Sequence, residues 1–201
     1  MSMNRNRNLI LAAALAAATL TACAKAPQED IASAQAEIDR AKQAQAEVWA
    51  PNEFQGADQA MTAANAEIAA QDQKWMKNYD KAKELLAQAK DQATQAATAS
   101  AANKEQARRD AETALTDADT ALQAAEAALK VAPVTKDSKA DLELYKSDLA
   151  TLRTTLDGAR AAFASEDYKK ALESTASVKD KAGTIAQQLE EAKKKRTAAR
   201  R

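Results

Sequence analysis

Cys23 is the only cysteine in this 201-residue chain, and the chain contains no histidine. Without histidine there is no common general base, no Ser-His or Cys-His pair, and no ordinary zinc site. The carboxylates are scattered among lysine and glutamine on polar helix faces, where solvated pairing at i,i+4 spacing is their expected role. We therefore expect no enzyme activity, no metal and no cofactor, and we look for covalent chemistry at the Cys23 sulfur.

A short apolar segment lies upstream of this cysteine. Arg5 and Arg7 supply positive charge, and residues 9–20 form an apolar run that is too short to span a bilayer as a permanent helix. These features are typical of a secretory signal, so we expect residues 1–22 to be removed. The alternatives for Cys23 are a small buried residue of an N-terminal membrane helix, or a stray thiol in a secreted protein.

Leu20, Thr21, Ala22 and Cys23 resemble the lipobox of bacterial lipoproteins. The resemblance implies that a signal peptidase recognises the three residues before Cys23, that the sulfur carries a diacylglycerol, and that the new N-terminus is acylated. Two or three acyl chains anchor a protein stably, whereas one chain holds it only marginally. Ala24 stands where an Asp would retain an enterobacterial lipoprotein in the inner membrane. The resemblance therefore implies an outer-membrane anchor that faces the periplasm.

Composition indicates an all-α fold. Removal of residues 1–22 takes away two arginines and no acid, so 29 basic residues become 27 against 29 acidic ones, and no net field recruits nucleic acid. The chain is 46% hydrophobic but only 3% aromatic, much of the apolar content is alanine, and glycine and proline number three each. This composition is typical of long helices that are joined along narrow seams.

Apolar residues recur three and four positions apart, as amphipathic helices require. The first two such segments are separated at Ala50-Pro51, where we expect a kink or a full turn because proline disfavours helix at the preceding residue. A third segment predicts a continuous helix from about residue 78 to residue 130, with a polar part at Ser100 and Asn103. The first two seams are Ile31, Ala34, Ile38, Ala41, Gln45 and Val48, then Phe54, Ala57, Met61, Ala64 and Ile68.

The last part of the chain predicts a second pair of helices with larger seam residues. Ser165 is expected to cap the final helix, and the basic residues near its end complement the negative end of the helix dipole. The first of these seams, which we expect to be the best core of the protein, is Leu142, Tyr145, Leu149, Leu152, Leu156, Ala159 and Phe163. The second is Tyr168, Leu172, Thr175, Val178, Ala182, Ile185, Leu189 and Ala192.

The two halves share an internal repeat. Residues 78–82 (Asn-Tyr-Asp-Lys-Ala) match residues 167–171 (Asp-Tyr-Lys-Lys-Ala), and an apolar helix precedes each tyrosine, so we predict a duplicated αα-hairpin. These features resemble a bacterial lipoprotein domain of unknown function, which is found alone or beside OmpA-like peptidoglycan-binding domains. The similarity covers about residues 48–110 and, more weakly, residues 141–190. It implies a helical fold and a location in the cell envelope, with no activity to transfer.

Two tryptophans and a basic run are the remaining candidates for interaction. Trp49 and Trp75 each lie beside a predicted break, where tryptophan either plugs the end of a hairpin or displays a binding surface. We favour the plug, because seams this poor in large residues need a few anchors. Tyr79 and Tyr168 receive the same interpretation. The basic run is interpreted either as a solvated helix cap, which we favour, or as a contact for anionic lipid or cell-wall polymer; it consists of Lys193, Lys194, Lys195 and Arg196.

The sequence thus predicts an elongated, coiled-coil-like bundle of antiparallel hairpins behind a lipid anchor. Two helical segments pair antiparallel with the long helix, and the last two pack against its C-terminal half. The expected parts are a signal peptide at 1–22, a lipidated N-terminus and linker at 23–28, a long hairpin at 29–131, a linker at 132–137 and a second hairpin at 138–199.

The predicted function is that of a non-enzymatic scaffold or spacer. Its partners are membrane lipid, through the anchor, and an unidentified envelope protein or cell-wall component. The alternative is an accessory protein that holds a small hydrophobic or anionic ligand between the hairpins. A pocket at Trp49, at Trp75 or along residues 142–163 favours that alternative, whereas close packing there favours the scaffold.

Overall fold

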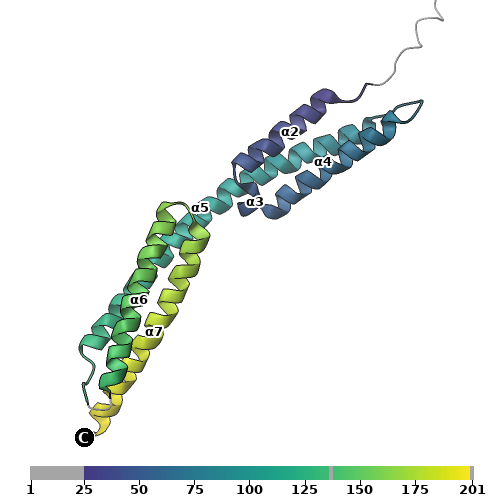
Figure 1. The fold of residues 1–201 in the computed structure, drawn as a ribbon. Helices are drawn as coiled ribbons and strands as arrows, with labels where there is room; N and C mark the ends of the chain where they lie inside the picture. The colour runs from purple at the N-terminus through teal and green to yellow at the C-terminus, as the bar shows by residue number, and fades with distance from the viewer. Residues whose placement is uncertain (1–24, 136–137, 200–201) are drawn as a thin grey trace, which may run out of the picture. The chain divides into compact units, whose positions relative to one another are not determined.

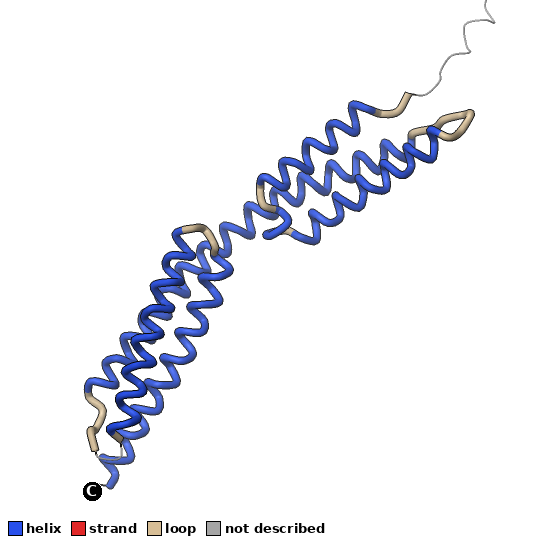
Figure 2. Tube along the Cα trace, in the orientation of Figure 1, coloured by secondary structure: helices blue, strands red, loops and turns tan. Residues whose placement is uncertain are grey.

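The computed structural model describes residues 25–135 and 138–199, which form six helices and no strand (Figures 1 and 2). The predicted all-α fold of helical hairpins is confirmed. Leu20, Thr21, Ala22 and Cys23 lie outside the described residues. The helices are α2 (Gln28–Gln43), α3 (Ala46–Trp49), α4 (Pro51–Asp72), α5 (Asp80–Lys130), α6 (Lys139–Ala164) and α7 (Tyr168–Ala199).

The chain divides into two compact units, and the boundary lies inside the longest helix. Unit 1 ends at Ala101 and unit 2 begins at Ala102, so α5 contributes its first part to one unit and its second part to the other. The sequence predicted this sharing of the long helix. However, the sequence predicted that the boundary between the two hairpins lies at residues 132–137. The boundary between the two compact units lies about thirty residues earlier.

Unit 1 is a three-helix bundle with a core of small side chains. The helices α2, α4 and the first part of α5 run side by side, with α4 antiparallel to the other two (Figure 1). The prediction that both segments pair antiparallel with the long helix is therefore wrong for α2, because the chain reverses fully between α2 and α4 and again between α4 and α5. Alanine's small side chain lets helices approach toward the close end of the usual range, and Leu86 is the largest side chain that is fully enclosed here. The fully buried alanines of this core are Ala34, Ala41, Ala46, Ala50, Ala57, Ala64, Ala82, Ala89, Ala93 and Ala96.

The reversal between α2 and α4 is a full turn that begins earlier than predicted. Gln45 adopts a left-handed conformation with φ of 60°, which ends the helical path six residues before Pro51. The single turn of α3 follows, and Pro51 then opens α4 at a position where its missing N–H costs nothing. The predicted continuation of the first seam through Gln45 and Val48 is therefore wrong, and Val48 is 47% exposed.

Ser100 of α5 stabilises this turn through a hydrogen bond between helices. Its fully buried hydroxyl donates a hydrogen bond of 2.5 Å to the carbonyl oxygen of Ala44, directly after α2. A carbonyl at a helix end has no partner within its own helix, so a donor from a neighbouring helix satisfies it. Ser100, in the polar part of the α5 seam, thus stabilises the turn after α2.

Unit 2 consists of the second part of α5 with α6 and α7, and its core contains larger side chains. The expected seam of α6 is buried at Leu149, Leu152 and Leu156, which pack with Leu122 of α5 and with Val178 of α7. Because each leucine buries more apolar area than an alanine, these contacts contribute more stabilisation per residue than those of unit 1.

The turn between α6 and α7 is capped by a different residue from the one predicted. Ser165 donates its hydroxyl back to the carbonyl of Ala162, so it closes α6. Glu166 follows in a left-handed conformation with φ of 63°. The carboxylate of Asp167 then accepts the backbone N–H of Lys170 at 3.2 Å and caps α7. The expectation that Ser165 caps the final helix is therefore wrong, because the chain uses two more residues to reverse before α7 begins at Tyr168.

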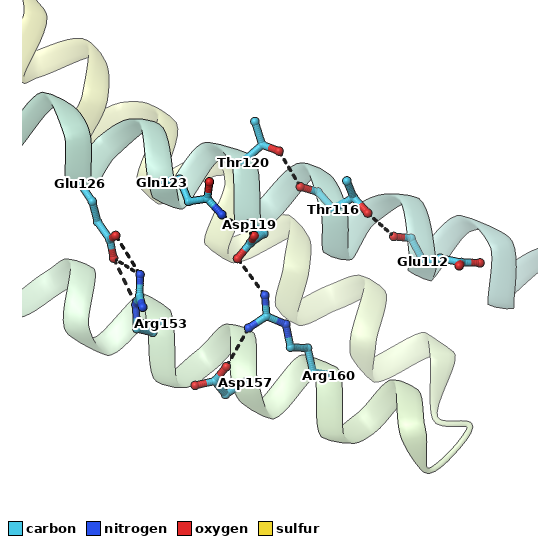
Figure 3. A network of polar contacts seen from close by, with 9 residues as sticks. All are labelled: Glu112, Thr116, Asp119, Thr120, Gln123, Glu126, Arg153, Asp157 and Arg160. Carbon is cyan, nitrogen blue, oxygen red and sulfur yellow. Dashed lines mark hydrogen bonds and ion pairs between the residues drawn. The ribbon is translucent and has the colours of Figure 1, made fainter.

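Ion pairs join the helices of unit 2 along its surface. The guanidinium of Arg153 on α6 contacts Glu126 of α5 at 2.6 Å, and Arg160 reaches Asp119 of α5 at 2.8 Å while also contacting Asp157 at 2.9 Å (Figure 3). Exposed pairs of this kind contribute about 0–1 kcal/mol each. They therefore help to set the register of α6 against α5 more than they stabilise the fold.

Candidate functional site

The two tryptophans lie in different environments. Trp49 is half-buried in α3, whereas Trp75 is 99% exposed in the loop between α4 and α5. The adjacent Met76 is 82% exposed. The predicted plug is therefore wrong for Trp75. The same interpretation is confirmed for the two tyrosines: Tyr79, which is 3% exposed, fills the end of this core, and Tyr168 is similarly buried and contacts the ring of Phe163.

We call residues 73–79, between the end of α4 and the start of α5, the hairpin tip. The Tyr79 hydroxyl donates a 2.5 Å hydrogen bond to Oδ1 of Asp72, and the Lys77 ammonium lies 3.3 Å from the same oxygen. The backbone N–H of Asn78 donates to the side-chain oxygen of the buried Gln71 at 3.2 Å. These contacts brace both sides of the loop against the end of α4.

The same contacts change the acidity of three groups. The pKa of Asp72 lies below its ordinary value of 3.8. The largest cause is the hydrogen bond from Tyr79, and the next is the hydrogen bond from Lys77. The hydrogen bond to Asp72 raises the pKa of Tyr79 above 10.0 and that of Lys77 above 10.5. Around neutral pH the three groups therefore form a stable arrangement of carboxylate, phenol and ammonium.

The hairpin tip displays an apolar pair between two cations. Lys74 and Lys77 flank Trp75 and Met76, and they are the only charged residues of the loop. Lys74 is exposed, and so is the apolar pair between the two lysines. An exposed tryptophan beside an exposed methionine is a candidate interaction surface, because contiguous exposed apolar side chains are typical of surfaces that meet another molecule.

The beginning of the described chain lies beside this tip. Lys25 borders a hollow of about 460 Å³ together with Met76, Lys77 and Lys83. The next residues hold the chain in place there, because Ala26 packs against the core of unit 1 and Pro27 is buried. The start of α2 and the α4–α5 loop accordingly lie at the same end of unit 1 (Figure 1).

Comparisons with protein-family models, with curated proteins and with solved structures gave no match. The site is therefore interpreted from its own residues. Within residues 25–135 and 138–199, no three His, Cys, Asp or Glu side chains are grouped as a metal ion would need. Among the helices in that same part of the chain, none is both long and apolar enough to cross a membrane.

A second candidate is a groove along α6 and α7. It has a volume of about 470 Å³ and is open to solvent beside the seam of residues 142–163. Leu152 and Ile185 form its floor, while Tyr145 and Lys181 stand at its sides. The Tyr145 hydroxyl donates to the side-chain oxygen of Gln188 at 3.0 Å, so this ring bridges the two helices.

The basic run lies on the last turns of α7. Lys193, Lys194 and Lys195 are exposed and Arg196 is half-buried. Lys193 lies 3.6 Å from Glu190, a contact that a solvated helix end commonly makes. This geometry fits both a helix cap and a contact for polyanions. The basic run belongs to unit 2, whereas Trp49 and Trp75 belong to unit 1.

Proposed function

We propose that the chain is a lipid-anchored protein of the bacterial envelope, which acts as a non-enzymatic scaffold and binds other envelope components through its helical surfaces. The observation that supports this most is Cys23 itself, which follows a charged segment, an apolar run and Leu-Thr-Ala. The anchor would be the covalent N-terminal lipid on Cys23, with the protein facing the periplasm from the outer membrane.

The folded part begins close to the proposed anchor. The first helix of unit 1 starts at Gln28, five residues after Cys23. A linker this short leaves the first unit next to the membrane surface, which suits a spacer or a scaffold better than a freely diffusing carrier.

Exposed apolar residues near the connections between helices supply contact points for a scaffold. Trp75 and Met76 lie at the connection between α4 and α5, and Val131 and Val134 are 60% and 70% exposed between α5 and α6. Clustered exposed apolar side chains are typical of surfaces that meet another protein or a membrane. The remaining helix faces are rich in ion pairs, which keep them soluble.

The anchor is tested by the variant Cys23→Ala. Cells expressing either form are fed a tagged fatty acid, and the protein is then isolated and its label measured. Label on the wild type and none on the variant is expected, because the thioether forms only on this sulfur, and density fractionation should place the wild type in the outer membrane. Equal labelling of both forms would refute the anchor.

The open groove supports the alternative function of ligand binding. Its apolar floor suits a small ligand with an apolar body, and Lys181 is the one cation among the lining residues, beside the carboxylates of Asp148 and Asp180. The anionic dye 1-anilinonaphthalene-8-sulfonate is a suitable probe. Saturable binding that is weakened by Lys181→Gln would favour the carrier, whereas binding without saturation would leave the scaffold as the better account.

A further inference from the structure

Unit 1 presents its most exposed aromatic residue at the end where the lipid anchor would attach. Cys23 precedes Lys25 by two residues, and two residues span at most about 7 Å. Lys25 in turn borders the same hollow as Met76 and Lys77 of the hairpin tip. A lipid on Cys23 would therefore hold the membrane surface next to Trp75.

We propose that the hairpin tip is a second, non-covalent membrane contact, which inserts Trp75 and Met76 into the interface of the leaflet that holds the lipid of Cys23. This inference rests on the proposed lipidation. The second contact would orient unit 1 on the membrane. A lipid tether alone leaves unit 1 free to rotate, whereas the tether and the hairpin tip together attach it to the membrane at two points.

The side chains of the tip match the chemistry of a membrane interface. Tryptophan is enriched at the depth of lipid headgroups, where its ring is partly apolar and its indole N–H meets polar groups. Lys74 and Lys77 flank the apolar pair, and Lys25 and Lys83 border the hollow beside it. Lysines at this depth are attracted to anionic lipid headgroups.

Acidic residues lie at this end of unit 1 as well. Asp72 accepts from Tyr79 and Lys77, so it is paired with one of these lysines. Asp80 borders the hollow beside Lys25 and Lys83, and Glu29 and Asp30 lie in the first turn of α2 at the same end. The lysines therefore add a local attraction to lipid headgroups, while Trp75 and Met76, which are 99% and 82% exposed, supply the main contact.

The brace of the tip prepares it for insertion. Tyr79 is buried and bonded to Asp72, and Asn78 is held by Gln71, so the loop between them keeps its shape without help from a partner. Insertion of a loop that is already ordered costs little further conformational entropy. The anchor would place the membrane directly beside the hairpin tip. A second copy of the chain or another protein would first have to diffuse to the tip and bind there.

The native pair of tryptophans provides both the probe and its control. The full chain is expressed with its lipid, purified in detergent and reconstituted into vesicles of phosphatidylcholine and phosphatidylglycerol with brominated acyl chains, which quench nearby tryptophan. Trp49→Phe leaves Trp75 as the only tryptophan, and Trp75→Phe leaves Trp49. Trp49 follows the far end of α2, a helix of 16 residues and therefore about 24 Å long.

We expect brominated lipid to quench most of the Trp75 emission and to shift it toward the blue, with little change for Trp49. Because Trp75 is exposed, Trp75→Phe should fold normally, and subtraction of its spectrum from that of the wild type isolates Trp75 even if Trp49→Phe is unstable. Lys74→Gln should weaken insertion about five-fold on anionic vesicles. Lys42→Gln, at the far end of α2, is the matched control and should change nothing.

Each other outcome overturns the proposal in a distinguishable way. Vesicle flotation with Trp75 quenched no more than Trp49 would overturn the membrane contact while leaving the anchor intact. A blue shift that grows with protein density without quenching by brominated lipid would mean that the tip contacts a second copy. Failure of the wild type to float with the vesicles would overturn the anchor, and the tip contact with it.

Discussion

Truncation of Leu156 to alanine should destabilise unit 2 more than truncation of any exposed leucine. Leu156 is 1% exposed in the core formed by α5, α6 and α7. The change deletes three methylene-sized groups, worth about 2.4 kcal/mol at about 0.8 kcal/mol each. A residual cavity increases the loss, so we expect about 3 kcal/mol within the usual range of about 2–5 kcal/mol.

Leu144→Ala is the matched control on the same helix. Leu144 is 59% exposed, so it keeps under half of its surface from water and its removal leaves no enclosed cavity. The expected loss in the free energy of unfolding is below about 1 kcal/mol. The two variants have the same chemical change on the same helix, and they differ in the burial of the side chain.

Native-state hydrogen exchange is the appropriate assay, because a chain with two compact units does not have to unfold in one step. Amides of α6 that exchange through unfolding of unit 2 should exchange about a hundredfold faster in Leu156→Ala, since about 1.4 kcal/mol corresponds to a factor of ten. Amides of α2 and α4 serve as an internal reference, because their core is a separate cluster. Equal acceleration by the two variants would refute the assignment of this core.

Two further predictions concern single polar contacts of unit 1. Ser100→Ala should lower the stability of the α2–α3 turn by about 1–3 kcal/mol, because the Ala44 carbonyl loses its donor. Hydrogen exchange of the amides around residue 45 measures this loss. Thr94→Ala is the control and should have no such effect, because the exposed Thr94 hydroxyl bonds only within α5. The brace of the hairpin tip should depend on pH at both extremes. Asp72 has a lowered pKa in the folded state, so its contribution is complete above 3.8 and is lost as the pH falls through the lowered value; Tyr79 has a raised pKa, so its contribution is complete below 10.0 and is lost as the pH rises through the raised value. Nuclear magnetic resonance of the Tyr79 ring should show a constant environment between these limits, and Asp72→Asn should abolish the acid transition; an acid transition that persists in that variant would mean that another group causes it.

The helices and their buried faces follow from local sequence. Alanine and leucine at three and four spacing identify the seams of α4, α5, α6 and α7, and the absence of Gly and Pro between residues 57 and 132 predicts the length of α5. These features are local, because a helix forms its hydrogen bonds within one segment and exposes a fixed set of side chains on each face.

The position of the first turn was not open to local reasoning. Gln45 is left-handed although it is neither glycine nor asparagine, and the donor that satisfies the adjacent carbonyl is Ser100, which lies 56 positions away from Ala44 in sequence. A contact of this separation depends on the packing of α5 against α2. The Ala50-Pro51 signal therefore marked the start of α4 correctly but missed the end of α2.

The hairpin tip shows a similar limit. Tyr79 continues the seam of α5, three positions before Ala82 and seven before Leu86, so a signal for its burial was present in the sequence. Trp75 lies four positions earlier and would extend the same face if the helix continued. The helix begins at Asp80, however, and the loop carries Trp75 out of register into solvent.

The sequence by itself determined the helical class, the faces of the helices and the candidate anchor at Cys23, because composition, periodicity and a short apolar leader are properties of contiguous residues. The tertiary structure alone decided that Trp75 is exposed, which residue caps α7, and that Lys25 lies beside Met76. These depend on which segments meet in space. For helices with alanine seams many registers bury similar areas, so the few large or polar side chains, such as Tyr79 and Ser100, decide among them once the helices are packed.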